Sequence, residues 1–240
     1  MRPIGFSTGA VAKADYRRAI TELLDSHVRV VELSALRRRE LPLLVADFKH
    51  LQLGEFDFVS FHAPSRFEAA EERDIIDELD RIAAFGIPII VHPDVIFTAS
   101  AWKHFGSLLF IENMDKRKPT GRTASDLTTL FNEFPTARMC FDVGHARQVD
   151  PTMLEAKLIL EQHRERLAEV HISEVNTASR HDPISDYAIR AFQTVAHLIP
   201  QCTPIVLETL IDSGQSTISR ELERAAEALI PSEDRVARAG

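Results

Sequence analysis

Seven acidic or histidine side chains share one position in the sequence pattern, because each stands at or near the end of a short apolar run and just before a loop. They are Glu32, His62, His92, Glu112, Asp142, His171 and Glu208. Carboxylates are rarely buried without a partner, so a group of them needs a neutralising charge. A divalent metal supplies that charge, and a mixed imidazole and carboxylate set suits Zn, Mn or Fe better than Mg or Ca.

A simpler interpretation exists for some single members of this set. His62 or His92 alone could be a hydrogen-bonded core histidine, and Glu32 could pair with an arginine. That interpretation fits Glu112, Asp142, His171 and Glu208 poorly when they are taken together. The residue types therefore predict a divalent metal site.

The apolar runs alternate with longer stretches of helical period, which is typical of parallel strands joined by helical crossovers. Eight runs are expected to be strands: Ile4 to Ser7, Val28 to Leu33, Phe56 to His62, Pro88 to His92, Leu108 to Glu112, Arg138 to Asp142, Glu169 to Ile172 and Pro204 to Glu208. Helices are expected over 15–24, 71–85, 125–134, 152–167, 186–199 and 218–229. The crossovers 41–51 and 100–105 are less regular, because Pro42 interrupts the first and the second is short.

Eight such units favour a single (β/α)8 TIM barrel over an open doubly wound sheet. A doubly wound sheet would usually have a glycine-rich phosphate turn after its first strand, and Ser7 to Ala10 is a poor match for one. In a barrel the carboxyl ends of the strands converge on one face. The predicted ligands would therefore share one pocket.

Length and composition are compatible with one enzyme domain over 1–230 and a tail over 231–240. No secretory signal is visible at the start, and no apolar run approaches the ~20 residues of a membrane-spanning helix, so a cytoplasmic protein is expected. The net charge of −8 argues against broad nonspecific binding to nucleic acid. The oligomeric state cannot be predicted from these properties.

Basic residues gather in the loops that are expected to follow the strands. They are Arg37, Arg38, Arg39, Arg66, Lys116, Arg117, Lys118, Arg122, Arg147 and Arg180. On the face that carries the ligands they would steer an anionic substrate, phosphorylated or sugar-like, toward the pocket. The alternative is that they are solvated charges paired with neighbouring acids. The loop 212–216 is either a phosphate-binding turn or a plain turn.

Six short motifs, in this order, resemble the xylose isomerase-like TIM-barrel superfamily, which includes sugar isomerases and epimerases and apurinic endonucleases of the endonuclease IV type. The motifs are Phe61 to Pro64, Val91 to Pro93, Ile111 to Asn113, Phe141 to Ala146, Val170 to Ile172 and Leu207 to Thr209. The resemblance covers nearly the whole chain. It implies a metal bound by Glu112, Asp142, His171 and Glu208, the set that is shared by the single-metal isomerases.

The endonuclease branch implies further ligands. It adds two histidines that match His62 and His92, with Glu112 bridging two metals, and a third site to which His145 and His181 correspond. Ser179 stands where that third site has an aspartate, with Glu174 or Asp182 as candidate replacements. We therefore expect two metals, and a third only if a replacement ligand is found. Otherwise His145 could orient substrate and His181 could be a surface loop residue.

Two reactions fit this set of residues. The first is metal-assisted hydrolysis of a small phosphoester, with Glu112 between two metals and Arg180 near the phosphoryl group. The alternative is a single-metal sugar or sugar-phosphate isomerase or epimerase, in which Glu112 and Glu208 form the acid/base pair. Nucleic acid is the less favoured substrate, because no long aromatic loop is available to hold a flipped nucleotide.

Overall fold

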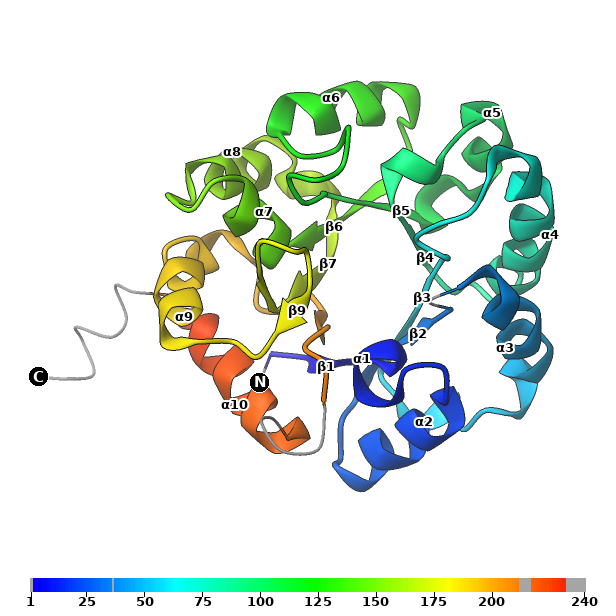
Figure 1. The fold of residues 1–240 in the computed structure, drawn as a ribbon, viewed down its shortest axis with the longest axis horizontal. Helices are drawn as coiled ribbons and strands as arrows, with labels where there is room; N and C mark the ends of the chain where they lie inside the picture. The colour runs from blue at the N-terminus through cyan, green and yellow to red at the C-terminus, as the bar shows by residue number, and fades with distance from the viewer. Residues whose placement is uncertain (1, 36, 212–216, 232–240) are drawn as a thin grey trace, which may run out of the picture.

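Eight parallel strands close into a barrel, in the order β1-β10-β7-β6-β5-β4-β3-β2, with helices around the outside (Figure 1). The computed structural model describes residues 2–35, 37–211 and 217–231. The predicted (β/α)8 TIM barrel is therefore confirmed. The loop 212–216 lies outside the described residues, and so does the predicted tail except for residue 231.

Each of the eight predicted strands is present in the barrel. Their bounds are β1 Ile4–Ser7, β2 Val30–Ser34, β3 Phe58–His62, β4 Ile89–Val91, β5 Leu109–Glu112, β6 Arg138–Asp142, β7 Leu167–Ile172 and β10 Ile205–Leu207. In the parallel register Asp142 lies opposite His171, and Glu112 lies opposite Cys140. The predicted ligands stand at the last position of a strand or close to it, so the barrel collects them at its carboxyl end.

The helices cover the outside of the barrel. The longer ones are α2 Tyr16–Asp25, α4 Glu72–Ala83, α6 Ala124–Glu133, α8 Leu154–Gln162, α9 Asp186–Gln193 and α10 Ile218–Ala228, and the shorter ones are α1 Thr8–Ala12, α3 Leu41–Asp47, α5 Ala99–Trp102 and α7 Val143–Val149. Single 3-10 turns are η1 Arg38–Glu40, η2 Phe48–His50, η3 Leu53–Glu55, η4 Ala69–Glu71, η5 Pro93–Val95, η7 Arg164–Arg166 and η8 Ala196–Leu198, and η6 spans Lys103–Leu108. The helix α4 illustrates the helical period, because it buries Ile75, Ile76, Leu79 and Ile82 on one face.

The barrel interior changes from apolar to polar along the strands. Side chains two residues apart on a strand point to the same face. Phe110 and Cys140 therefore lie one layer below Glu112 and Asp142, where they pack with Ile90. Part of the layer below the predicted ligands is therefore apolar.

Several predicted boundaries were wrong for local reasons. Pro42 lies in the first turn of α3, where its missing N–H is not needed, so it does not interrupt the helix. The helix predicted over 152–167 ends at Gln162, and β7 begins at Leu167. Outside the barrel sheet, β8 Glu174–Val175 and β9 His181–Asp182 form an antiparallel pair that is too short to be predicted from periodicity. No helix in the described ranges is both long enough and apolar enough to cross a membrane.

Candidate metal centre

Glu112, at the end of β5, is the centre of the site and is 1% exposed. Its Oε2 lies 3.2 Å from Nε2 of His62 and 3.1 Å from Nε2 of His92. Its Oε1 lies 3.2 Å from Nδ1 of His145 and 3.6 Å from Nδ1 of His171. The two oxygens of one carboxylate thus face two different pairs of histidines.

The first ligand group contains Glu112, Asp142, His171 and Glu208, with one atom from each lying within 4.8 Å of the others. Asp142 uses Oδ1 to cap α7, accepting from the backbone N–H of His145 at 2.6 Å, which leaves Oδ2 toward the site. Nδ1 of His171 lies 3.6 Å from Oε2 of Glu208. The structure therefore brings together all four residues that the sequence motifs imply as ligands of one metal.

The second ligand group contains His62, His92 and Glu112, and one ligand atom from each residue lies within 4.8 Å of the other two. Nδ1 of His62 donates to the carbonyl oxygen of Ala63 at 2.7 Å. This hydrogen bond fixes a proton on Nδ1 and directs Nε2 to Glu112. A backbone acceptor on the other ring nitrogen is the usual arrangement for a metal-binding histidine.

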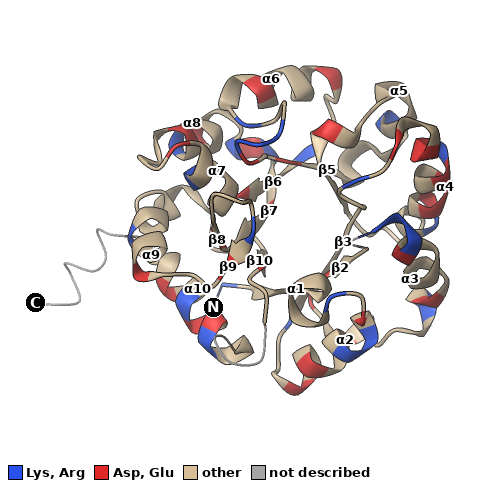
Figure 2. Cartoon of the chain, viewed as in Figure 1, with Lys and Arg blue, Asp and Glu red and all other residues tan. Residues whose placement is uncertain are grey.

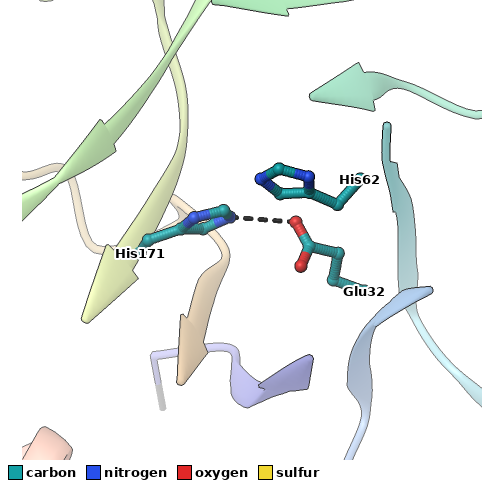
Figure 3. Close-up of side chains that lie close together, drawn as sticks. All are labelled: Glu32, His62 and His171. Carbon is teal, nitrogen blue, oxygen red and sulfur yellow. Dashed lines mark ion pairs between the residues drawn. The ribbon is translucent and has the colours of Figure 1, made fainter. Parts of the chain in front are cut away.

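The third ligand group contains Glu32, His62 and His171, which converge from β2, β3 and β7 (Figure 3). Oε2 of Glu32 lies 3.0 Å from Nε2 of His171, and its Oε1 accepts from the hydroxyl of Ser34 at 3.1 Å. The suggestion that Glu32 pairs with an arginine was therefore wrong. Because Glu32 faces Nε2, His171 presents Nδ1 to Glu112 and Glu208.

A second buried carboxylate contacts the same edge of His171. Oε1 of Glu169 lies 3.4 Å from Nε2 of His171 and accepts from the hydroxyl of Ser60 at 3.0 Å. Glu169 was not among the predicted site residues. It stands two positions before His171 on β7, so the two-residue strand period could have placed it inside the barrel.

In the first ligand group, Oδ2 of Asp142, Oε2 of Glu208 and Nδ1 of His171 are buried without a hydrogen-bond partner in the described part of the chain. Buried polar atoms are normally paired, so these three are available to bind a metal. Ligands about 2.1 Å from one ion lie roughly 3 to 3.4 Å apart, close to the separations measured here. The donor types and their spacing fit a divalent metal.

Charges within the site compensate one another through strong pKa shifts. Burial disfavours the charge on Glu112, but His92, His145 and His171 hold its pKa well below the usual value. Burial also disfavours a charged His62, but Glu32 and Glu112 raise its pKa to about 9. Burial raises the pKa of Glu208 to about 8, with Glu112 and Asp142 adding to the effect. A metal that binds here must displace protons.

His145 and His181 lie beside these groups, on α7 and β9. Nδ1 of His145 lies 3.0 Å from the carbonyl oxygen of Asn113, and Nδ1 of His181 lies 2.8 Å from the hydroxyl of Ser173. The centroids of the two rings are 5.5 Å apart. His181 therefore lies in the wall of the site. The alternative that His181 is a surface loop residue was wrong.

Ser179 and the two candidate replacement ligands, Glu174 and Asp182, all have other partners in the described part of the chain. Ser179 accepts a hydrogen bond from Gln148 at 3.2 Å. Glu174 pairs with Arg147 at 3.0 Å and accepts from the backbone of Ser185, and Asp182 accepts from Asn176. Within the described ranges no group of three ligands includes His145 or His181.

An open cavity of about 680 Å³ lies over the ligands at the carboxyl ends of the strands. His62, His92, Glu112, His145, His181 and Glu208 all line it. Cavities of this size accommodate small molecules.

The predicted basic face is only partly formed. Of those residues, Arg66, Arg117 and Lys118 line the cavity, and Lys118 is paired with Asp94 at 2.7 Å. Arg180 is exposed and is not among the lining residues. Three of the predicted cations, Arg38, Lys118 and Arg147, lie within 3.1 Å of carboxylates. Basic and acidic residues are interspersed around the molecule (Figure 2).

Comparisons with known proteins agree on the fold. No protein-family model and no curated protein sequence matches this chain. Endonuclease IV from Thermus thermophilus matches with a TM-score of 0.58 and 17% identity, over 94% of this chain and 97% of that chain. A protein described as a sugar phosphate isomerase/epimerase, from Anabaena variabilis, matches with a TM-score of 0.60 and 14% identity, over 100% of both chains.

A xylose isomerase-like TIM-barrel protein from Mycobacterium smegmatis, in complex with magnesium, matches with a TM-score of 0.60 and 11% identity, over 95% of this chain and 96% of that chain. These structural neighbours share the barrel fold of this chain over nearly its whole length. This confirms the fold that the sequence motifs imply.

Proposed function

We propose that this protein is a divalent-metal-dependent hydrolase of a small phosphoester, with a two-metal site. One observation carries the proposal. The two oxygens of Glu112 face separate histidine pairs, at 3.1 to 3.2 Å for His62 and His92 and at 3.2 to 3.6 Å for His145 and His171. A carboxylate placed in this way suits a bridge between two ions, as in two-metal hydrolytic sites.

The residues would divide the work as follows. Asp142, His171 and Glu208 would hold one metal, His62 and His92 the other, and Glu112 would be shared. When bound, two divalent metals supply an activated water and neutralise charge on a phosphoryl group.

The remaining polar residues of the cavity would bind and orient the substrate. Arg66 and Arg117 line the cavity and are the nearest candidates to bind the phosphoryl oxygens. Arg180 is a weaker candidate for this role, because it is exposed and is not among the lining residues. His145 and His181 would orient the substrate from α7 and β9.

Metal content tests the two-metal site directly. Protein purified without chelator and then reconstituted with Zn or Mn is expected to hold two ions per chain by elemental analysis. The double variant with His62→Ala and His92→Ala should hold one ion and lose phosphomonoester hydrolysis. Two ions retained by that variant, or none in the wild-type protein, would contradict the proposal.

A second reaction is supported by the first ligand group on its own. Glu112, Asp142, His171 and Glu208 form a complete four-ligand set without His62 or His92. Oε1 of Glu112 and Oε2 of Glu208 each lie 3.6 Å from Nδ1 of His171, so two carboxylates would flank one metal. This arrangement suits an isomerase or epimerase of a sugar or sugar phosphate, with Glu112 and Glu208 as the acid/base pair.

The two reactions differ in a measurable way. An isomerase would exchange the proton alpha to the carbonyl of a ketose phosphate with solvent deuterium, which NMR detects. It would keep this activity with a single metal after His62→Ala. The hydrolase would release inorganic phosphate and would catalyse no such exchange.

A further inference from the structure

Two phenylalanine rings form part of the wall of the metal-site cavity. Phe67 and Phe97 line the same cavity as His62 and His92. Their ring centroids are 5.8 Å apart in an edge-to-face arrangement, and Phe97 is 47% exposed. A single exposed phenylalanine needs no explanation, but two rings in contact beside a polar site form an apolar surface that a ligand can cover.

Buried hydrogen bonds anchor the backbone at Phe97. Oε1 of Glu72, which is buried, accepts from the backbone N–H of Phe97 at 2.7 Å and of Thr98 at 3.0 Å. The same oxygen accepts from the indole of Trp102 at 2.9 Å, and Trp102 is fully buried. The backbone of the loop after β4 is therefore anchored at the residue that carries the exposed ring, which lowers the cost of ordering this wall when a ligand binds.

A guanidinium group lies next to this aromatic wall. Arg66 precedes Phe67 in the chain, lines the cavity and is exposed. No carboxylate is within ion-pair distance of Arg66 in the part of the chain that the structure describes, whereas Lys118 is neutralised by Asp94. The wall thus combines two apolar rings with one available positive charge, and both adjoin the ligand histidines.

We propose that the substrate carries a planar ring, and that Phe67 and Phe97 bind this ring while its phosphoryl group lies at His62, His92 and Glu112. This inference rests on the proposed hydrolysis of a phosphoester and names its substrate class, an ester of phosphate with an aromatic or heteroaromatic group. Contact between aromatic rings in preferred geometry strengthens binding by about three- to tenfold beyond the area buried.

Two phosphonates with equal numbers of carbon atoms test the wall without turnover. Phenylphosphonate has a planar ring and cyclohexylphosphonate does not, and calorimetry on the metal-loaded protein gives both dissociation constants. We expect phenylphosphonate to bind about three- to tenfold more tightly. Phe97→Leu, which keeps apolar bulk but removes the ring, should abolish most of this preference.

Phe85→Leu is the matched control. Phe85 is 50% exposed and contacts a second ring, Phe48, at 5.1 Å, but it does not line the cavity. This variant should keep the wild-type preference.

Equal affinities in the wild-type protein, an unchanged preference in Phe97→Leu, or binding of neither phosphonate would overturn the inference. In a separate assay with phenyl phosphate, an ester that can be hydrolysed, absence of phosphate release with the phosphonate preference intact would instead defeat the proposed hydrolysis.

Discussion

Replacing Glu32 by glutamine tests how the barrel interior orients His171, a candidate metal ligand. Oε2 of Glu32 lies 3.0 Å from Nε2 of His171, and both residues are 0% exposed. Oε2 of Glu32 can only accept a hydrogen bond, so it favours a proton on the facing Nε2 and leaves Nδ1 directed at Glu112 and Glu208. A glutamine amide can instead donate to Nε2, which favours a proton on Nδ1, the nitrogen that the metal needs.

The expected loss follows from this geometry. Removing the partner of a metal-binding histidine lowers metal affinity by about 10- to 100-fold, which corresponds to about 1.4 to 2.8 kcal/mol. Oε1 of Glu169 also lies 3.4 Å from Nε2 of His171 and would still orient this ring in the variant. We therefore expect a loss in the lower half of this range. Competition with a chelator of known Zn affinity, at pH 8, measures the loss.

Glu221→Gln provides the control. Glu221 is also 0% exposed, and its Oε2 accepts from the backbone of Ile184 at 3.1 Å, but it lies on α10 and does not line the cavity. This variant should lose stability in thermal unfolding and keep the wild-type metal affinity. Equal metal affinity in Glu32→Gln and wild type, with nitrogen NMR still placing the proton of His171 on Nε2, would refute the reasoning.

Three further changes should alter metal binding in defined directions. Ser179→Asp should raise the metal content from two ions to three by elemental analysis, because it restores a carboxylate beside the histidines of α7 and β9; an unchanged content would show that the loop geometry forbids the third site. The carboxylates around His62 outweigh the effect of burial and raise the pKa of this histidine to about 9. His62 is therefore protonated at pH 7, and a metal must displace its proton. Metal affinity should therefore rise from pH 6 to about pH 9, and calorimetry in buffers of different ionisation enthalpy should detect proton release; a flat profile would contradict the pKa argument. Gly144→Ala should weaken metal binding, because an added Cβ would lie 2.4 Å from the carbonyl oxygen of Ser173 and 3.2 Å from Oδ1 of Asp142 and would displace α7; wild-type affinity in this variant would mean that the helix moves without disturbing the ligands.

The sequence by itself determined the barrel and placed the candidate metal ligands at its carboxyl end. Strand and helix periods are local properties, so eight alternating units could be counted without knowledge of their contacts. Residues such as Glu112 and Asp142 close an apolar run, and parallel strands all end on one face, so their convergence followed from the fold class.

Tertiary structure decided which atoms face one another. The division of the Glu112 oxygens between two histidine pairs depends on the stagger of neighbouring strands, which no single strand encodes. The pairing of Glu32 with His171 joins β2 to β7 across the barrel, and the ion pairs that neutralise Lys118 and Arg147 join separate loops. The local sequence pattern determines the position of a residue on its strand, but the distance from its side chain to a partner on another strand depends on how the whole barrel closes.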